Sequence, residues 1–455
     1  MWMQILGLEV PAMLLNFSCC NFKSFSDGFE FDMTPEKRMT ELGYSILKRN
    51  VNGKGESALS ASVIYGPNAA GKTSVVNAMS CFKQIVLRGN IRDAADDRSG
   101  DHVSSGMNLA PFAFKDTAAP VSFDITFIQD DVKYRYALSI FIGKFLDKDA
   151  ERYVNSEQLY VNDILVYDRT KDSVLKLKLD PISDFLNVGY ELKDTEKSRK
   201  AMSNNITSDS LLLVTDFNSF CSKKVVSEIR CWFEEKFIVV NSADRTRFYP
   251  GMPEDDGRAM INVYINRIAQ EAGIIGSDFA YVNDAETHTT RLMSVLQKTD
   301  SKLYGLDADR IESVGTMRLI SIMPVIISAL KKGAVLIMDE GDSSLHPMIM
   351  MNLISIFHND DVNINGAQFI FNTHNPIYMN HNLFRRDEIK FVERDTETKS
   401  SSLYSLSDFR ANGEISVRKT SDYMKNYFVS RYGAIVDIDF TDIISEILKG
   451  DSADD

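Results

Sequence analysis

The sequence predicts an α/β fold with a mixed central sheet, an antiparallel β-subdomain beside it and an inserted helical domain. Short runs of apolar residues at 61–65, 334–338 and 368–371 predict buried strands, and the last two runs end directly in charged or polar residues. Such ends are typical of a parallel sheet that gathers ligand-binding loops at one edge. Alternating apolar and polar residues from Val121 onward predict the antiparallel subdomain.

The N-terminal region is expected to begin with a strand pair at 14–17 and 29–32, and Met13 could serve as an alternative translation start. The polar segment 34–56 predicts an irregular, partly mobile connection. Residues 93–106, rich in Asp, Ser and Gly, predict an exposed loop. Three strands with a period of two then follow, at 121–127, 134–140 and 157–161.

A glycine-rich run fits the phosphate-binding pattern G-x-x-x-x-G-K-[ST] at every fixed position; it comprises Gly66, Pro67, Asn68, Ala69, Ala70, Gly71, Lys72 and Thr73. The backbone N–H groups of such a loop converge on the phosphates of a nucleotide at a helix N-terminus. Lys72 would reach the β and γ phosphates, and the Thr73 hydroxyl would bind Mg²⁺. A glycine-rich turn with a chance Lys-Thr pair is the alternative, which the flanking strand and helix patterns disfavour.

Two carboxylates, Asp339 and Glu340, directly follow the apolar run 334–338. Asp339 would hold Mg²⁺, either directly or through water. Glu340 would lie near the γ-phosphate, where a carboxylate can orient or deprotonate the attacking water. Acidic pairs after a strand also commonly cap helices, but the phosphate loop makes the catalytic interpretation the better one.

Two further segments could contact a γ-phosphate. His374 follows the third buried strand, where it could sense that phosphate, although a lone His is more often structural. Ser313 and Gly315 form a Ser-x-Gly turn before an apolar-periodic helix at 317–330. Such a turn offers N–H groups and a helix dipole to an anion, and by itself it could equally be an N-cap.

Together these motifs resemble the ABC-type ATPases of the OLD-like and SMC-like branch, and within it the prokaryotic ATPases of phage-defence and restriction loci. Five segments carry the resemblance and span most of the chain, namely residues 21–25, 66–73, 312–316, 339–347 and 372–376. At a finer level the chain resembles the ATPase subunits of PARIS-type two-component defence systems and of some abortive-infection systems.

The resemblance implies an ABC-type P-loop ATPase head in which two ATP molecules with Mg²⁺ are sandwiched between two heads. Ser313 and Gly315 of one subunit would cap the γ-phosphate that Lys72 and Thr73 of another subunit hold. Hydrolysis would therefore require at least a homodimer, and the PARIS resemblance implies a larger homo-oligomer. Residues 343–347 would form the loop that crosses the dimer interface.

The resemblance also assigns His374 as the switch histidine. The family's N-terminal strand motif, which lies near the nucleotide, matches three residues: Asn21, Lys23 and Ser24. Lys23 could equally be a solvated surface charge. One feature departs from the family, because no convincing glutamine of a metal-sensing Q-loop occurs around 107–112, where only Asn108 could substitute.

Three regions are expected along the chain. Residues 13–192 would form the N-terminal part of the ATPase head, residues 193–305 a helical insertion, and residues 306–455 the C-terminal part of the head. Within the insertion, amphipathic helices are expected at 211–217, 225–237 and 260–269. The insertion has no sustained heptads and is too short for a long coiled-coil arm, so we expect it to serve oligomerisation or partner docking.

The composition limits the class of partner. A net charge of −13 over 455 residues, with a pI near 5.1, argues against a protein that coats nucleic acid, although local DNA binding stays open. Five cysteines show no metal or disulfide spacing, and the N-terminus lacks the basic start of a signal peptide. The apolar runs fall short of the ~18–20 residues that span a membrane. These features predict a cytoplasmic protein with no membrane partner.

We expect no intrinsic nuclease activity. The segment after Lys390 is shorter than a metal-binding TOPRIM nuclease domain would need. Asp437 and Asp439 form the only Asp-x-Asp near the end, and a surface turn or strand edge is the better interpretation of that pair.

Two functions of different classes follow. The first is an ATP-hydrolysing sensor or scaffold of an antiphage, abortive-infection complex, which holds a separately encoded toxic effector, a TOPRIM-type nuclease, until a phage product triggers its release. The second is an SMC-like or RecF-like DNA-repair ATPase that clamps DNA between its heads. The acidic charge and the missing coiled coil favour the first. A nucleotide-binding structural subunit with negligible turnover is a third possibility, which the intact Glu340 disfavours.

Overall fold

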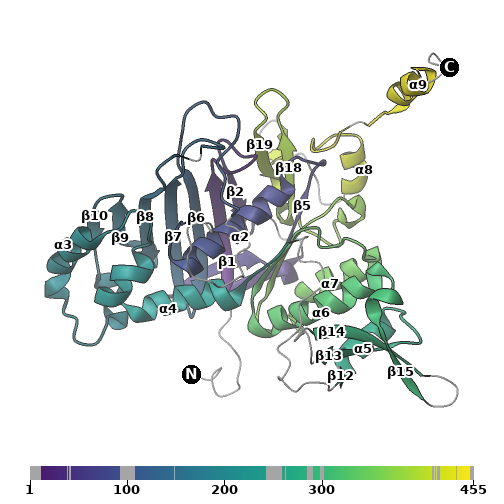
Figure 1. Ribbon diagram of the computed structural model, residues 1–455, viewed down its shortest axis with the longest axis horizontal. Coiled ribbons are helices and arrows are strands. Elements are labelled where there is room, and N and C mark those ends of the chain that lie inside the picture. Colours follow the sequence, from purple (N-terminus) through teal and green to yellow (C-terminus); the bar gives the residue numbers. More distant parts are fainter. Residues whose placement is uncertain are drawn as a thin grey trace.

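The computed structural model of this 455-residue chain describes residues 12–37, 39, 42–92, 108–147, 149–241, 259–261, 263–283, 290–297, 302–411, 414–415, 417, 421–436 and 438–450. Figure 1 shows the N-terminal part of the chain, in purple to teal, beside the C-terminal part, in green to yellow. The predicted loop at 93–106 and the Asp437 position lie outside the described residues.

An antiparallel sheet of seven strands forms the N-terminal side. Its strands are β1 (Met13–Cys20), β2 (Phe29–Asp32), β6 (Val121–Gln129), β7 (Val132–Phe141), β8 (Tyr153–Val161), β9 (Ile164–Thr170) and β10 (Val174–Leu177). They are arranged in the order β10-β9-β8-β7-β6-β1-β2. Burial alternates along β7, where Tyr134, Tyr136, Leu138 and Ile140 face the core. The predicted antiparallel subdomain and its strands are confirmed.

The second sheet has six strands in the order β11-β16-β17-β5-β18-β19. Its strands are β5 (Ala61–Tyr65), β11 (Phe237–Val240), β16 (Val335–Met338), β17 (Gln368–Asn372), β18 (Ile389–Arg394) and β19 (Ser401–Ser405). All neighbours are parallel except β18 and β19, so the sheet is mixed. Every residue of β5, β16 and β17 is buried, which explains their continuous apolar sequences.

Helices cover both faces of this central sheet. Helix α2 (Lys72–Arg88) packs with Val335 and Ile337 in the core shared with the seven-stranded sheet. Leu336 and Met338 point to the other core, which contains α6 (Val314–Lys332) and α7 (Pro347–Phe357). Successive residues of one strand thus face different layers, because strand side chains alternate. The predicted α/β class, with a mixed central sheet beside an antiparallel sheet, is confirmed.

Helix α6 corrects one expectation about apolar runs. It has 19 residues and a mean hydropathy of 1.5, so by length and composition it could cross a membrane. Half of its apolar window is buried inside the protein, against the central sheet and its neighbours. A buried core helix has the same composition as a membrane span, and this packing is typical of the former.

The prediction of a helical insertion at 193–305 is wrong for its second half. The helical part ends with η6 (Trp232–Lys236), and β11 then joins the central sheet beside β16. A four-stranded antiparallel sheet follows. The amphipathic pattern at 260–269 indicated a helix, and local patterns did not indicate the strands of this sheet. The elements of this region are α3 (Thr195–Asn205), η5 (Leu213–Cys221), α4 (Lys223–Cys231), η6 (Trp232–Lys236), β12 (Ala259–Ile261), α5 (Val263–Glu271), β13 (Asp278–Asn283), β14 (Thr290–Gln297) and β15 (Leu303–Asp307).

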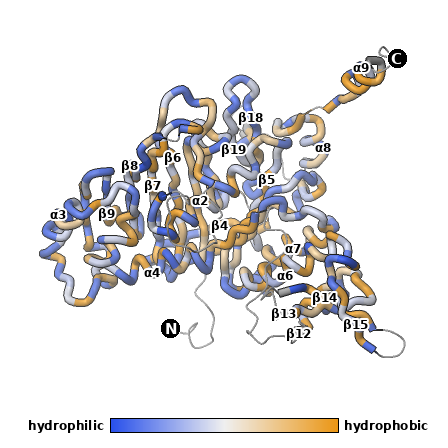
Figure 2. The backbone as a smooth tube through the Cα atoms, viewed as in Figure 1, coloured by the Kyte–Doolittle hydropathy of each residue, from blue (hydrophilic) through white to orange (hydrophobic). Residues whose placement is uncertain are grey.

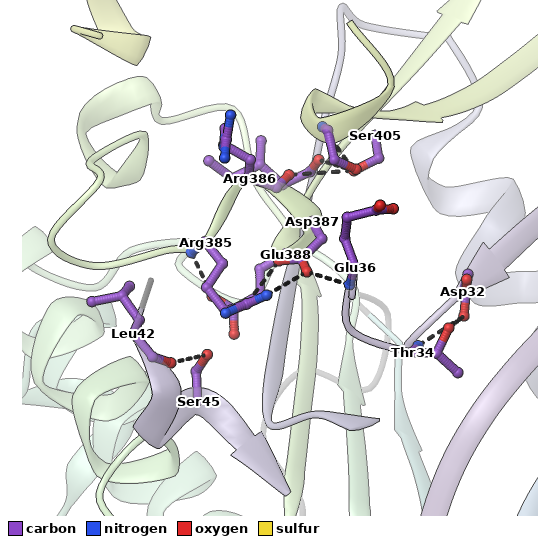
Figure 3. Close-up of polar contacts among 12 residues, drawn as sticks. Asp32, Thr34, Glu36, Leu42, Ser45, Arg385, Arg386, Asp387, Glu388 and Ser405 are labelled. Atoms are coloured by element: carbon purple, nitrogen blue, oxygen red, sulfur yellow. Dashed lines mark hydrogen bonds and ion pairs between the residues drawn. The ribbon is translucent and has the colours of Figure 1, made fainter. Parts of the chain in front are cut away.

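The segment 34–56, expected to be irregular, contains a β-hairpin of β3 (Ile46–Val51) and β4 (Lys54–Leu59). Figure 3 shows how the chain before it is anchored: the N–H of Glu36 donates to Asp387 Oδ2 at 2.9 Å. Arg385 holds the same carboxylate, with an Nη2–Oδ2 distance of 2.8 Å. The segment is thus tied to a distant part of the chain through the main chain of Glu36, a contact that local sequence does not reveal.

The remaining elements are short. They are η1 (Gly43–Ser45), η3 (Asp180–Phe185), η4 (Leu192–Asp194), η7 (Ala308–Arg310), η8 (Pro376–Tyr378), η9 (Arg386–Glu388), η10 (Leu406–Asp408), β20 (Arg410–Ala411), β21 (Glu414–Ile415), α8 (Tyr423–Phe428) and α9 (Thr441–Gly450). Helix α9 stands apart from the rest of the molecule in Figure 1.

Candidate nucleotide-binding site

The candidate site lies at the carboxyl ends of three neighbouring parallel strands. Strand β17 pairs with β16 on one side and β5 on the other. The phosphate loop follows β5, Asp339 follows β16, and Asn372 ends β17. Because parallel strands end at the same edge, the sheet brings these three segments together.

The main chain of the phosphate loop requires glycine at the two glycine positions of the pattern. Gly66 and Gly71 have φ of 155° and 117°, which residues with a side chain rarely adopt. A Cβ at Gly66 would lie 2.2 Å from the carbonyl oxygen of Val392, and a Cβ at Gly71 would lie 2.5 Å from Ser24 Oγ. Helix α2 begins directly after Gly71, so its first N–H groups face the loop. Asn68 is exposed on the loop.

Lys72 lies inside the loop. Its ammonium donates to the carbonyl oxygens of Gly66 at 2.7 Å and Pro67 at 2.9 Å, and the residue is only 6% exposed. Burial lowers the pKa of Lys72 to about 8, against the opposing influence of Asp339 and Glu340. The charge is therefore held where a phosphate would lie, in surroundings that favour an anionic partner.

Thr73 and Asp339 form an oxygen-donor pair. The Thr73 hydroxyl donates to Asp339 Oδ1 at 3.0 Å, and Asp339 is 2% exposed. A hydroxyl and a carboxylate are the hard ligands that Mg²⁺ takes beside phosphate oxygens. The donor set therefore fits a nucleotide-bound Mg²⁺ held by these two residues.

Asn372 organises both carboxylates, and the sequence did not single it out as a site residue. Its amide nitrogen donates to Asp339 Oδ1, and its amide oxygen accepts from the N–H of Glu340. Glu340 has a φ of 50°, so this bond holds a left-handed turn at the end of β16. The sequence did offer one signal for this role, because Asn372 directly follows the strand predicted at 368–371.

The loops after β16 and β17 are also joined. The Thr373 hydroxyl donates to Asp342 Oδ2 at 2.7 Å, and it accepts from the N–H of Asn375 at 2.9 Å. His374 lies between Thr373 and Asn375 in the chain and is exposed at the rim of the site. Partial burial of the imidazole ring lowers the pKa of His374, and the nearby Lys72 ammonium lowers it further. The neutral form of His374 is therefore favoured.

The N-terminal residues have different surroundings. Asn21 is buried and donates to the carbonyl oxygen of Ala119 at 2.8 Å, so its amide ties the end of β1 to the chain before β6. Lys23 is half-buried, and burial lowers its pKa, so it is not a fully solvated charge. The Ser24 hydroxyl is buried beside Gly71 and has no hydrogen-bond partner among the described residues. Asn108 is exposed.

The Ser-x-Gly turn of Ser313 and Gly315 lies beside the loop after Glu340. The Ser313 hydroxyl accepts from the N–H of Thr316 at 3.1 Å, so Ser313 is the N-cap of α6, and it is exposed. A Cβ on Gly315 would lie 2.6 Å from the carbonyl oxygen of Ser344, which has a φ of 64°. The absence of a side chain at Gly315 therefore allows the Ser-x-Gly turn to contact the turn at Ser344. The role that the resemblance assigns to Gly315 did not suggest this contact.

Several solved structures are similar to this chain at low identity. An SMC head domain from Thermotoga maritima is 14% identical, with a TM-score of 0.38, over 86% of this chain and 98% of that chain. A structure of an SmcHead bound to the C-winged helix domain of ScpA has the same identity and TM-score, over 86% and 97%. An Smc head domain with an extended coiled coil, bound to the C-terminal domain of ScpA derived from Pyrococcus furiosus, is 12% identical, with a TM-score of 0.34, over 87% and 96%.

A search of curated proteins finds no match. Among the described residues, no group of three or more His, Cys, Asp or Glu side chains is placed to hold a metal ion.

A family model described as "AAA domain, putative AbiEii toxin, Type IV TA system" matches residues 61–380, which is more than half of the chain and includes every strand end described above. The chain therefore belongs to this family of AAA-type P-loop ATPase domains.

Proposed function

We propose that this protein hydrolyses ATP with Mg²⁺ at an interface between two copies of the chain, and that it is the sensor or scaffold subunit of an antiphage, abortive-infection complex. The observation that carries the ATPase proposal is the cluster at the strand ends, where Asn372 binds Asp339 and the main chain of Glu340, and Asp339 accepts from Thr73. The family match supports the abortive-infection role.

Each residue at the strand ends has a distinct task in this proposal. Lys72 neutralises charge on the β and γ phosphates, and Thr73 and Asp339 hold Mg²⁺, which supplies further charge neutralisation there. Glu340 orients the attacking water and takes its proton. His374 donates to the γ-phosphate from the rim, and its change of partner on hydrolysis reports the nucleotide state.

A second copy completes the site in this proposal. Ser313 is exposed at the start of α6, and its neighbour Gly315 contacts the loop that follows Glu340. From a facing copy, this turn would offer its N–H groups to the γ-phosphate held by Lys72. Because Gly315 contacts Ser344, the closing of two copies onto each other would shift the loop that begins at Glu340, four residues before Ser344.

The finer role follows the resemblance to OLD-like and PARIS-type ATPases. In that role the oligomer holds a separately encoded toxic effector, a TOPRIM-type nuclease, and releases it when a phage product is sensed in the cytoplasm. The ATPase subunit itself would cleave no nucleic acid. The acidic charge of −13 supports a protein partner over a coat on DNA.

The experiment compares two variants purified from cells that carry the native neighbouring genes. Glu340→Gln should bind ATP without turnover and keep the closed pair, together with a stoichiometric protein partner. Lys72→Ala should lose ATP binding and the closed pair, and serves as the matched control. Normal hydrolysis by Glu340→Gln would refute the catalytic assignment. Nucleic acid in place of a protein partner would favour the DNA-clamping, SMC-like or RecF-like alternative.

A further inference from the structure

The C-terminal helix α9 has an apolar face that packs on nothing in the described part of the chain. Ile443, Ile444, Ile447 and Leu448 are 57%, 51%, 55% and 67% exposed. They occupy positions i, i+1, i+4 and i+5 and so form one stripe along the helix. Figure 2 shows this helix as an apolar segment that projects from the body. A ten-residue helix is marginal in water by itself, so this stripe requires a partner surface.

The same chain has an apolar groove of about 790 Å³ between helices α5, α6 and α7. Helix α6 contributes Leu319, Met323, Ile326, Ile327 and Leu330. Helix α7 contributes Met348, Ile349, Leu353 and Ile356. Met348 at its rim is 64% exposed, although an unpartnered surface residue of this helix would more commonly be polar.

The dimensions of the groove and of α9 agree. From Leu319 to Leu330 the wall of α6 is about 16 Å long at 1.5 Å per residue. Helix α9 has ten residues and is about 15 Å long. An amphipathic helix that lays its apolar stripe into a groove between helices is a common mode of recognition.

The charges are also complementary. Asp442 and Glu446 lie one turn apart and flank the Ile443 side of the apolar stripe. Arg267 and Glu271 of α5, both exposed, line the groove, and the exposed Lys331 follows Leu330 at one end of it. The acidic side of α9 would therefore meet a rim in which the two basic residues outnumber Glu271.

We infer that α9 of one copy docks into the α5–α6–α7 groove of a second copy. Figure 1 shows α9 leaving the body beside α8 and pointing away from α5, α6 and α7, so a second molecule is the occupant that this arrangement offers. This contact is separate from the ATP-dependent pairing proposed above. It gives the chain a second interface between copies, which can extend a pair into a larger assembly.

The groove also borders the loop that follows Glu340. His346 and Met348 line it, and they directly follow the loop 343–345 that touches Gly315. A docked α9 would therefore hold the start of α7 and the end of that loop. Assembly and hydrolysis would be coupled through this short segment.

The test uses full-length protein without nucleotide, in a Lys72→Ala background that removes ATP-dependent pairing, and measures mass by sedimentation over a range of concentrations. A tail variant carries Ile444→Asp and Ile447→Asp, and a groove variant carries Met348→Asp. All three positions are half or more exposed, so the body should stay folded. Val188→Asp, at a fully exposed site, is the control for an added surface charge.

We expect self-association in the parent, an association about a hundredfold weaker in each variant alone, and no change in the control. An equal mixture of tail and groove variants should recover association, because one intact tail can still meet one intact groove. Arg267→Glu should weaken association and Glu446→Arg should restore it in the double variant.

Three results would overturn the inference. A parent that stays monomeric at all concentrations, or variants that associate as the parent does, would show that the stripe and the groove do not meet between copies. Weak variants whose mixture fails to recover would show that the stripe and the groove are not the two halves of one contact. Loss of the ATPase activity would not bear on this test, because the background is already unable to bind ATP.

Discussion

Replacing Asn372 with leucine tests whether its buried amide positions Asp339 and Glu340, the two carboxylates of the proposed ATPase site. Asn372 is 1% exposed, donates to Asp339 and accepts from the N–H of Glu340. Asn372→Leu removes a bond to a charged carboxylate, worth about 1.5–3 kcal/mol, and leaves a backbone N–H unpaired at a cost of about 1–3 kcal/mol. We expect the free energy of unfolding to fall by about 2–5 kcal/mol.

The effect on catalysis should be separable from this loss of stability. If about 3 kcal/mol of the lost interaction serves to hold Glu340 and Asp339 for the transition state, kcat falls about a hundredfold at 1.36 kcal/mol per factor of ten. ATP affinity should change less, because Lys72 and the loop N–H groups are untouched. Steady-state ATP hydrolysis and equilibrium nucleotide binding measure the two quantities.

Asn363→Leu is the matched control. Asn363 is 5% exposed, and its amide makes three bonds to main-chain atoms of Phe357 and Ala367, at the other end of β17 from the site. Both variants should lose stability, which chemical denaturation reports, but only Asn372→Leu should lose kcat in the folded protein. Equal kcat values for the two variants would refute a positioning role for Asn372.

Three other predictions concern charge and packing. Burial lowers the pKa of Lys72 to about 8, and a bound phosphate would raise it again. Above pH 8 the binding of ATP must therefore take up a proton. We expect ATP affinity to be flat below pH 8 and to fall about tenfold per pH unit above it. In Gly315→Ala the Cβ would lie 2.6 Å from the Ser344 carbonyl oxygen, so the loop must shift; we expect hydrolysis to fall about tenfold or more with ATP binding kept. Glu157 and Arg169 form a fully buried ion pair at 3.3 Å, so Glu157→Gln should cost about 3–5 kcal/mol of stability by chemical denaturation.

Each of these has a control. Lys72→Arg should abolish the alkaline fall in ATP affinity, and a fall that persists would assign the proton elsewhere. Gly43→Ala adds a Cβ that meets nothing within 4 Å and should leave hydrolysis unchanged. Equal rates in both glycine variants would dismiss the contact with Ser344. Glu151→Gln, in an exposed pair with Lys171, should cost less than about 1 kcal/mol, and a similar loss at both glutamates would contradict the burial argument.

Most strands and the main helices could be predicted from local patterns. The strands at 334–338 and 368–371 were evident because both of their faces are buried, which selects continuous apolar residues. The hairpin at 46–59 was missed because its polar residues alternate with few apolar ones, and β11 was missed because four residues do not distinguish a strand from a helix.

Contacts between distant segments could not be predicted. Gln368 shows the reason, since its buried amide accepts from the N–H of Leu14 and donates to the carbonyl oxygen of Leu59. Ser401 likewise donates to the carbonyl oxygen of Ala70 in the phosphate loop at 2.6 Å. The partners lie more than 300 residues apart. Nothing in the residues near Gln368 or Ser401 encodes which carbonyl or N–H each will meet.

The sequence by itself determined the phosphate loop, the carboxylates after the buried strand and the α/β class. These features depend on local main-chain geometry: two glycines with positive φ, a helix that starts at Lys72, and apolar runs of strand length. The tertiary structure alone decided that Asn372 holds Asp339 and Glu340, that Gly315 meets Ser344, and that α9 leaves the body with its apolar stripe uncovered. Strand order and helix packing set these relations, because they choose which distant segments share an edge or a surface.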